Sequence, residues 1–276
     1  MANDQGRCIP LSLPRRWMGD TLHFSHRVPI VAAERTFRIQ ALVDARRAAP
    51  HPPSWNALVI KAVGLVSARL PALRLAYMPY PWPRLYEAPY SVASVVFDRV
   101  FRGEPATFMA PLSQPEKRTL ADIQSKVEAW RVDPIEHHGP LRRLVRSARP
   151  PLPLRRLIWS IGLYASGIER ARHFGTFGVN SIAGLRGRML MFKIPITSAF
   201  YYGAVSKGTM AIQMAFDHRV FDGVTAGRVG GLLEDVFNNE LVDEVNQQLS
   251  AADGTTANGT FASTAPGTSV DEPSRL

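Results

Sequence analysis

Several features are scarce in this 276-residue chain, and each scarcity excludes a class of protein. The single cysteine, Cys8, rules out an internal disulfide framework and is typical of a reducing cytoplasm. No apolar run reaches the roughly 18 residues of a transmembrane helix, and residues 1–8 lack the apolar centre of a signal peptide. His137 and His138 form an isolated pair without metal-ligand spacing, so no bound metal is expected. There is also no phosphate loop or dinucleotide-binding glycine motif.

What the chain does contain is a large apolar content and an excess of positive charge. Hydrophobic residues make up 46% of it, enough for one large globular α/β domain. The net charge of +10 suits nucleic acid, an anionic membrane surface or an acidic co-substrate such as coenzyme A. The basic stretches show no recognisable nucleic-acid-binding module, so a nucleic-acid partner is not expected.

The most informative stretch is residues 209–231. The apolar run 210–216 predicts a strand, and a helix is predicted from residue 224. Between them, His218 is able to take a proton from a thiol, hydroxyl or amine near neutral pH. Asp222 would hold an arginine or a local turn, and Gly223 would allow a backbone angle that other residues resist. Taken alone, this spacing also fits a structural histidine.

The order Phe-Asp-His-Arg-Val-Phe-Asp-Gly at residues 216–223 resembles the active-site segment of 2-oxoacid dehydrogenase acyltransferase catalytic domains. These belong with the chloramphenicol acetyltransferase-like enzymes. Related condensation enzymes usually carry a second histidine where this chain has Asp217, so the resemblance favours the dehydrogenase type.

Residues 174–184 resemble a second hallmark of that family, in which a hydroxyl helps to hold the oxyanion of a tetrahedral intermediate. On strict alignment Asn180 takes the position of the hydroxyl, and Ser181 follows it. Because neighbouring strand residues point to opposite faces, only one of them is expected to face the site. We expect Asn180, with Ser181 as the second choice.

The resemblance covers about residues 10–245. Predicted elements in the family order include a helix over 54–70 capped by Ser54, strands over 90–97 and 107–112, and a helix over 118–130. Near the start, Arg15 or Arg16 is expected to pair with Asp222 as in some relatives, although a solvated charge is an equal alternative. The Pro-, Tyr- and Trp-rich stretch 73–90 is interpreted as a surface excursion rather than as part of a substrate tunnel wall.

Residues 134–174 have no counterpart in the family pattern. Six arginines between 142 and 156 precede the apolar segment 157–163. Basic residues beside an apolar, Trp-bearing segment are typical of a helix pair on a membrane surface. An insertion packed on the protein itself, or on a neighbouring subunit, is the alternative. The expected organisation is an extension (1–9), a catalytic domain (10–247) and a disordered tail (248–276).

The resemblance implies a two-layer α/β sandwich of the chloramphenicol acetyltransferase type, with a mixed sheet and helices on one face. It implies a homotrimer with active sites between subunits. In these sites His218 would act as general base in acyl transfer from a thioester, of coenzyme A or an acyl carrier protein, to a hydroxyl, amine or thiol. No bound cofactor is expected, and the location would be the cytoplasm, peripheral to the inner face of the membrane.

Two other functions stay open. The reversed order of Asn180 and Ser181 would also fit a non-catalytic trimeric scaffold with a decayed site. An antibiotic-modifying acetyltransferase shares the chemistry but needs no Arg-rich insertion. Neither a lipoyl-carrying domain nor a subunit-binding domain is recognisable, so a role as the core of a dehydrogenase complex is not expected.

Overall fold

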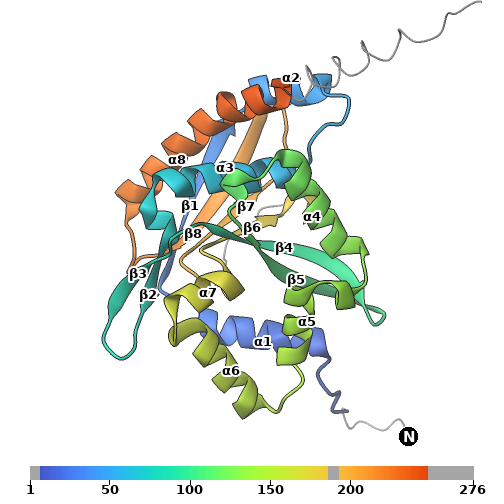
Figure 1. The fold of residues 1–276 in the computed structure, drawn as a ribbon, viewed down its shortest axis with the longest axis vertical. Coiled ribbons are helices and arrows are strands. Elements are labelled where there is room, and N and C mark those ends of the chain that lie inside the picture. The colour runs from blue at the N-terminus through green and yellow to red at the C-terminus, as the bar shows by residue number, and fades with distance from the viewer. Residues whose placement is uncertain (1–6, 186–192, 248–276) are drawn as a thin grey trace, which may run out of the picture.

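A six-stranded mixed sheet forms the centre of the computed structural model, which describes residues 7–185 and 193–247 (Figure 1). The strand order is β1-β8-β7-β6-β4-β5. The strands are β1 (Ile30–Arg38), β4 (Val92–Phe101), β5 (Glu104–Ser113), β6 (Phe177–Ser181), β7 (Ser198–Tyr202) and β8 (Thr209–Asp217). β6 runs parallel to both of its neighbours, and the other pairs are antiparallel. The expected tail, 248–276, and most of the expected extension lie outside the described residues.

One face of the sheet is covered by a layer of helices (Figure 1). These are α2 (Gln40–Ala48), α3 (Trp55–Arg69), α4 (Leu120–Val132) and α8 (Gly223–Asn238), and residues 240–247 are also helical. The predicted cap of α3 is formed, because Ser54 Oγ accepts a hydrogen bond from the Ala57 N–H at 3.2 Å. The mixed sheet under this helical layer confirms the expected two-layer α/β fold class.

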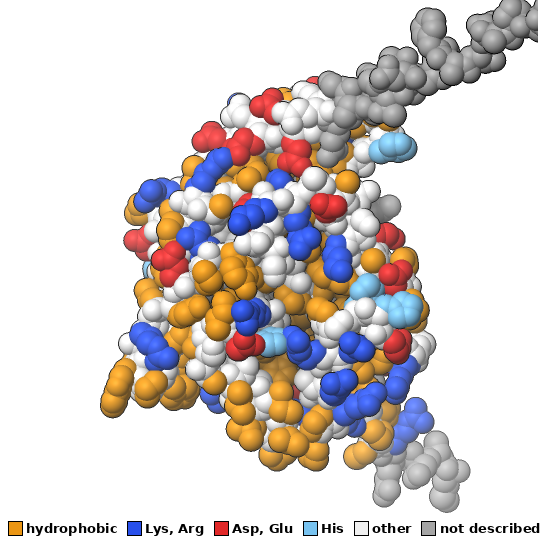
Figure 2. Space-filling model, in the orientation of Figure 1, with side chains coloured by type: hydrophobic (Ala, Val, Ile, Leu, Met, Phe, Trp, Pro, Cys, Tyr) orange, Lys and Arg blue, Asp and Glu red, His pale blue; other side chains and the backbone are white. Residues whose placement is uncertain are grey.

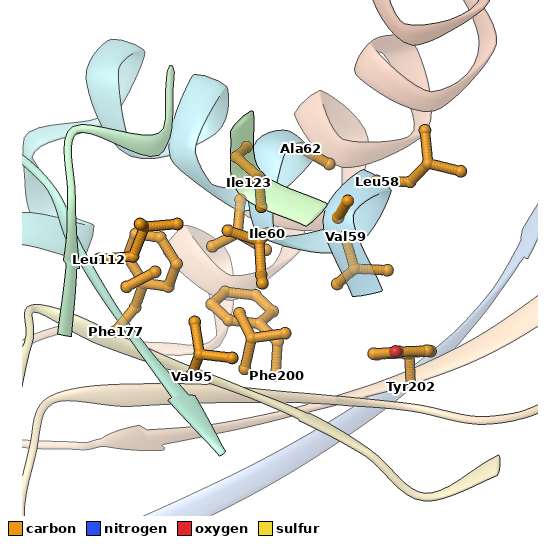
Figure 3. Packing of buried hydrophobic residues seen from close by; sticks show 14 of the residues in the cluster. Leu58, Val59, Ile60, Ala62, Val95, Leu112, Ile123, Phe177, Phe200 and Tyr202 are labelled. Atoms are coloured by element: carbon orange, nitrogen blue, oxygen red, sulfur yellow. The ribbon is translucent and has the colours of Figure 1, made fainter. Parts of the chain in front are cut away.

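The main core lies between α3 and the sheet. Figure 3 shows Val59 and Ile60 of α3 facing Val95, Phe177 and Phe200 of three adjacent strands. Each of these side chains is fully buried, which contributes roughly 1.5–3 kcal/mol per residue. A much smaller apolar cluster occupies the other face of the sheet, formed by Ile182, Ala199, Tyr201 and Ala215. The central strands are therefore fixed mainly from the α3 side.

Residues 73–90 form a separate two-stranded hairpin. It consists of β2 (Leu75–Met78) and β3 (Arg84–Glu87), and its turn exposes Tyr80 and Trp82. Short 3₁₀ segments connect other elements, at Pro71–Arg74, Pro115–Lys117, Ile135–His137 and Ala183–Leu185. The hairpin projects beside α7 and thus borders the insertion (Figure 1).

The insertion forms α5 (Gly139–Ser147), α6 (Leu152–Tyr164) and α7 (Gly167–Phe174), which gather with α1 (Leu13–Ser25) beside β4 and β5 (Figure 1). A single buried carboxylate, Asp20 of α1, holds α6 in place. Its oxygens lie 2.8 Å from Arg155 Nε and 3.2 Å from Arg156 Nε. The Trp159 ring stacks on Phe24 of α1, with ring centroids 5.8 Å apart.

These contacts correct part of the membrane interpretation. Arg155, Arg156 and Trp159 face α1, so this side of the insertion packs on the protein itself. None of the helices in the described residues is long and apolar enough to span a bilayer.

Replacing Asp20 by asparagine (Asp20→Asn) is expected to lower the free energy of unfolding by about 3 kcal/mol, because two arginines lose a buried charged partner. The matched control is Asp44→Asn, which removes an exposed carboxylate 3.5 Å from Arg47 and should cost less than about 1 kcal/mol. Urea unfolding measures both variants. Equal losses would show that the Asp20 ion pairs do not stabilise the insertion.

Candidate active site

The backbone at the end of β8 is fixed from both sides. β8 lies between β1 and β7, and the Asp217 N–H donates to Thr197 O at 2.8 Å. The next N–H, that of His218, donates to Pro29 O at 3.0 Å, just before β1 begins. The turn that carries His218 therefore starts from a rigid strand end, as a catalytic side chain requires.

The His218 side chain is exposed, and one of its ring nitrogens is already occupied. Nδ1 lies 3.2 Å from Phe221 O, and the ring meets that of Phe216 edge-on with centroids 6.1 Å apart. With the proton on Nδ1 donated to this carbonyl, the lone pair is on Nε2 and is available to accept a proton. This is the arrangement that a general base needs.

An ion pair at the base of the turn was not singled out as part of the site from sequence. Asp217 is 1% exposed and binds Arg219 in a bidentate manner, with Nε–Oδ1 at 2.9 Å and Nη2–Oδ2 at 2.7 Å. The Arg219 N–H also donates to Oδ1, and the Arg219 guanidinium stacks on the Tyr77 ring at 4.0 Å. The only signal available was opposite charges on either side of His218.

Asp222 and Gly223 start helix α8. Asp222 Oδ1 accepts a hydrogen bond from the Thr225 N–H at 2.9 Å, and this bond lowers the pKa of Asp222. The reason given for Gly223 was wrong: its φ is not in the left-handed region, and an added Cβ would meet no atom within 4 Å. A role of Gly223 in the site stays a prediction.

The structure does not bring Arg15 or Arg16 to Asp222. Both arginines lie on α1, where Arg16 Nε donates to Leu11 O at 3.0 Å. The ion pairs between described residues include none from either arginine to Asp222, whose carboxylate caps α8 instead. The expected pairing is therefore not formed within one chain.

Asn180 and Ser181 end β6 and point to opposite faces of the sheet. Asn180 is in register with Tyr201, on the face opposite α3, and is half-buried. Ser181 is in register with Tyr202, on the helix-covered face, and its hydroxyl accepts a hydrogen bond from the Ala183 N–H at 3.4 Å. Burial raises the pKa of the neighbouring Tyr202. Only Asn180 is thus directed to the open face.

His218 and Asn180 lie far apart along the sheet. Asn180 aligns through β7 with Gln213 of β8, five residues before His218. At about 3.4 Å per residue, this corresponds to roughly 17 Å along the strand. One chain therefore does not bring the imidazole and the amide together. No group of three or more His, Cys, Asp or Glu side chains suited to a metal occurs within 7–185 and 193–247.

No protein-family model matches the chain, and no curated protein is similar to it in sequence. Solved structures are similar in fold. A dihydrolipoamide acetyltransferase of Azotobacter vinelandii has a TM-score of 0.60 and 16% identity, over 86% of this chain and 93% of that one. A probable dihydrolipoamide acetyltransferase of Listeria monocytogenes has a TM-score of 0.59 and 16% identity, over 89% and 97%. A truncated catalytic core of the 2-oxoacid dehydrogenase complex of Thermoplasma acidophilum has a TM-score of 0.60 and 14% identity, over 84% and 98%. The resemblance is thus confirmed at the level of the fold, which is that of dihydrolipoamide acetyltransferase catalytic domains.

Proposed function

We propose that this protein is an acyltransferase that moves an acyl group from a thioester to a hydroxyl, amine or thiol. One observation carries the proposal: the exposed His218 ring has Nδ1 against Phe221 O and leaves Nε2 open. It stands at the end of a central strand in a fold that acetyltransferases also have. The thioester would be that of coenzyme A, as a co-substrate, or of an acyl carrier protein.

In the proposed reaction the acceptor's X–H group points to Nε2 of His218. His218 takes the proton as X attacks the thioester carbon, so that a C–X bond forms and the carbonyl oxygen becomes an oxyanion. The amide N–H of Asn180 holds this charge. The intermediate collapses by breaking the C–S bond, and the imidazolium returns its proton to the leaving thiolate. Proton transfer contributes about 10²–10⁴ in rate, and the oxyanion donor about 10²–10³.

The separation of His218 and Asn180 supports a site shared between copies of the chain. With roughly 17 Å of strand between them, His218 of one copy would meet Asn180 or Ser181 of the next in a homotrimer. For the Azotobacter enzyme, the catalytic roles of a serine, a histidine and an asparagine were investigated, the last two being four residues apart. His218 and Asp222 have the same spacing, so Asp222 is proposed to position the turn as the cap of α8.

We also propose that the outer side of the insertion contacts an anionic membrane. The lower end of the molecule in Figure 2 gathers hydrophobic side chains beside a group of basic ones. The exposed members are arginines and large apolar residues of α5, α6 and their connection: Arg142, Arg143, Arg146, Arg149, Leu152, Leu154, Leu157, Ile158 and Ile161. The five apolar side chains are 39–56% exposed.

These two sets of side chains lie together. Arg143 of α5 and Ile158 and Ile161 of α6 line one mainly apolar hollow of about 350 Å³. An apolar strip beside arginines is complementary to an anionic bilayer surface. Each arginine there contributes about 1 kcal/mol to the free energy of membrane binding. A lipid-associated acceptor would follow from this placement.

Replacing His218 by alanine is expected to reduce thioester consumption by about 10²–10⁴ in kcat, because the base is lost. The exposed side chain contributes little to stability, so the variant should remain folded and of unchanged oligomeric state. His51→Ala, an exposed histidine between α2 and α3, is the matched control. The assay supplies acetyl and longer acyl thioesters with hydroxyl, amine and thiol acceptors. Full turnover by the His218 variant would refute the proposal, and inactivity of the unmodified protein towards every pair would favour the scaffold.

Asn180→Ala should lower kcat by about 10²–10³ with little change in KM, since an oxyanion donor acts mainly in the transition state. Ser181→Ala should leave kcat nearly unchanged, because Ser181 is in register with Tyr202 on the opposite face of the sheet. The two variants are compared by steady-state kinetics. The reverse order of effects would assign the donor role to Ser181 and contradict the one proposed here.

The protein should bind vesicles containing phosphatidylserine at low salt and release them as salt is added. The double variant Arg142→Gln and Arg146→Gln should bind about thirtyfold more weakly, whereas the exposed Arg47→Gln on α2 should bind like the unmodified protein. Co-sedimentation measures binding, with phosphatidylcholine vesicles for comparison. Equal weakening by all the arginine changes, or no binding at low salt, would refute the membrane contact.

A further inference from the structure

A small cavity lies where two segments that the proposed reaction does not use meet the turn after β8. Its volume is about 110 Å³. The hairpin β2–β3 provides Tyr77 and its connection Tyr80, while α6 and α7 provide Tyr164 and Arg170. Arg27 and Arg219 also line it, and we refer to these six arginine and tyrosine residues as the arginine–tyrosine pocket.

Arg170 is the buried charge of this pocket. It is 4% exposed, and its guanidinium donates to two backbone carbonyls, Tyr77 O at 2.9 Å and Pro195 O at 3.2 Å. These bonds use two of its five N–H donors, and neither acceptor is charged. Burial lowers the pKa of Arg170 to about 10, so the group remains charged at neutral pH. A buried cation is costly unless an anion lies near it.

The other side chains add positive charge and donors. Asp217 forms its ion pair with Arg219 and also favours the charged form of Arg170, so among the described residues this one carboxylate stands against the three arginines of the pocket. Arg27 is exposed at the rim, with its guanidinium 5.8 Å from the Phe24 ring centroid. The Tyr164 ring meets Tyr80 edge-on at 5.9 Å. Burial raises the pKa of Tyr164, so its hydroxyl keeps its proton as a hydrogen-bond donor.

We propose that the arginine–tyrosine pocket binds a single phosphate group. A volume of about 110 Å³ is large enough for one tetrahedral oxyanion. The guanidinium of Arg170 and the hydroxyl of Tyr164 are hydrogen-bond donors in the lining, and Arg27 adds a second guanidinium at the exposed rim. The phosphate is either free inorganic phosphate or the terminal group of a phosphate ester whose remainder stays outside. Coenzyme A is the ester implied by the proposed acyl transfer, and only that choice of source rests on the proposed function.

Isothermal titration calorimetry of the full chain with inorganic phosphate, at constant ionic strength maintained with chloride, tests the site. The variants are Arg27→Ser and Tyr164→Phe, which remove a rim charge and a donor hydroxyl without touching His218. Each should weaken phosphate binding about tenfold. Arg38→Ser is the matched control, because Arg38 is exposed at the opposite end of β1 from this turn. Circular dichroism confirms that all variants are folded.

Saturable phosphate binding that is weakened by the two pocket changes and kept by Arg38→Ser supports the site. No binding, or equal weakening in all three variants, overturns it. Competition then identifies the source: displacement of phosphate by coenzyme A but not by pantetheine assigns a phosphate of the co-substrate, and binding of phosphate unaffected by coenzyme A assigns free phosphate. Since binding is measured without turnover, loss of the acyl-transfer proposal would leave this result unchanged.

Discussion

The pairing of Asp217 with Arg219 is the interaction on which the candidate site depends. A carboxylate that is 1% exposed requires a charged partner, and the bidentate contact with Arg219 supplies one two residues away. The Asp217–Arg219 ion pair spans His218 and so stabilises the turn from which the His218 side chain projects. The same guanidinium stacks on Tyr77, which ties the hairpin β2–β3 to the turn. One ion pair thus links the turn that carries the imidazole, the hairpin and one wall of the arginine–tyrosine pocket.

The excess of arginine in the insertion serves several purposes that composition alone does not separate. Arg155 and Arg156 neutralise Asp20 and bind α6 to α1. Arg170 is buried against neutral carbonyls beside a cavity. The arginines of α5 remain exposed next to the apolar strip of α6. A guanidinium forms an ion pair within the fold, donates hydrogen bonds to a bound anion or remains a surface charge, according to what lies opposite it. The net charge of +10 is therefore consistent with all three roles.

Local signals in the sequence predicted much of the fold. The cap at Ser54, the strand before His218 and the alternation of Asn180 and Ser181 all depend on residues within a few positions of each other, and the structure shows each of them. The failures concern longer range or finer geometry. Asp20 meets Arg155 across 135 positions, and no spacing rule connects them. Asp222 had two possible partners, and the nearby Thr225 N–H holds it rather than a distant arginine. Trp159 is of a residue type that often anchors helices at membranes, but it faces Phe24 of α1. The sequence of a helix does not show which of its faces packs against another helix.

The two faces of the sheet explain why a single copy does not bring His218 and Asn180 together. Helices cover the face that carries Phe200 and Ser181, while Asn180 points to the face whose apolar cluster has only four buried members. The imidazole lies at one end of β8, whereas the amide lies two strands away on β6, level with a position of β8 five residues before His218. A head-to-tail contact would place the β8 turn of one copy against the β6 end of the next. If that rotation closes after three copies, it forms three identical sites and leaves no unmatched His218 or Asn180. The length of β8 between Gln213 and His218 would then matter for function, because it sets the distance between the His218 of one copy and the Asn180 of the same copy that the neighbouring copy must replace.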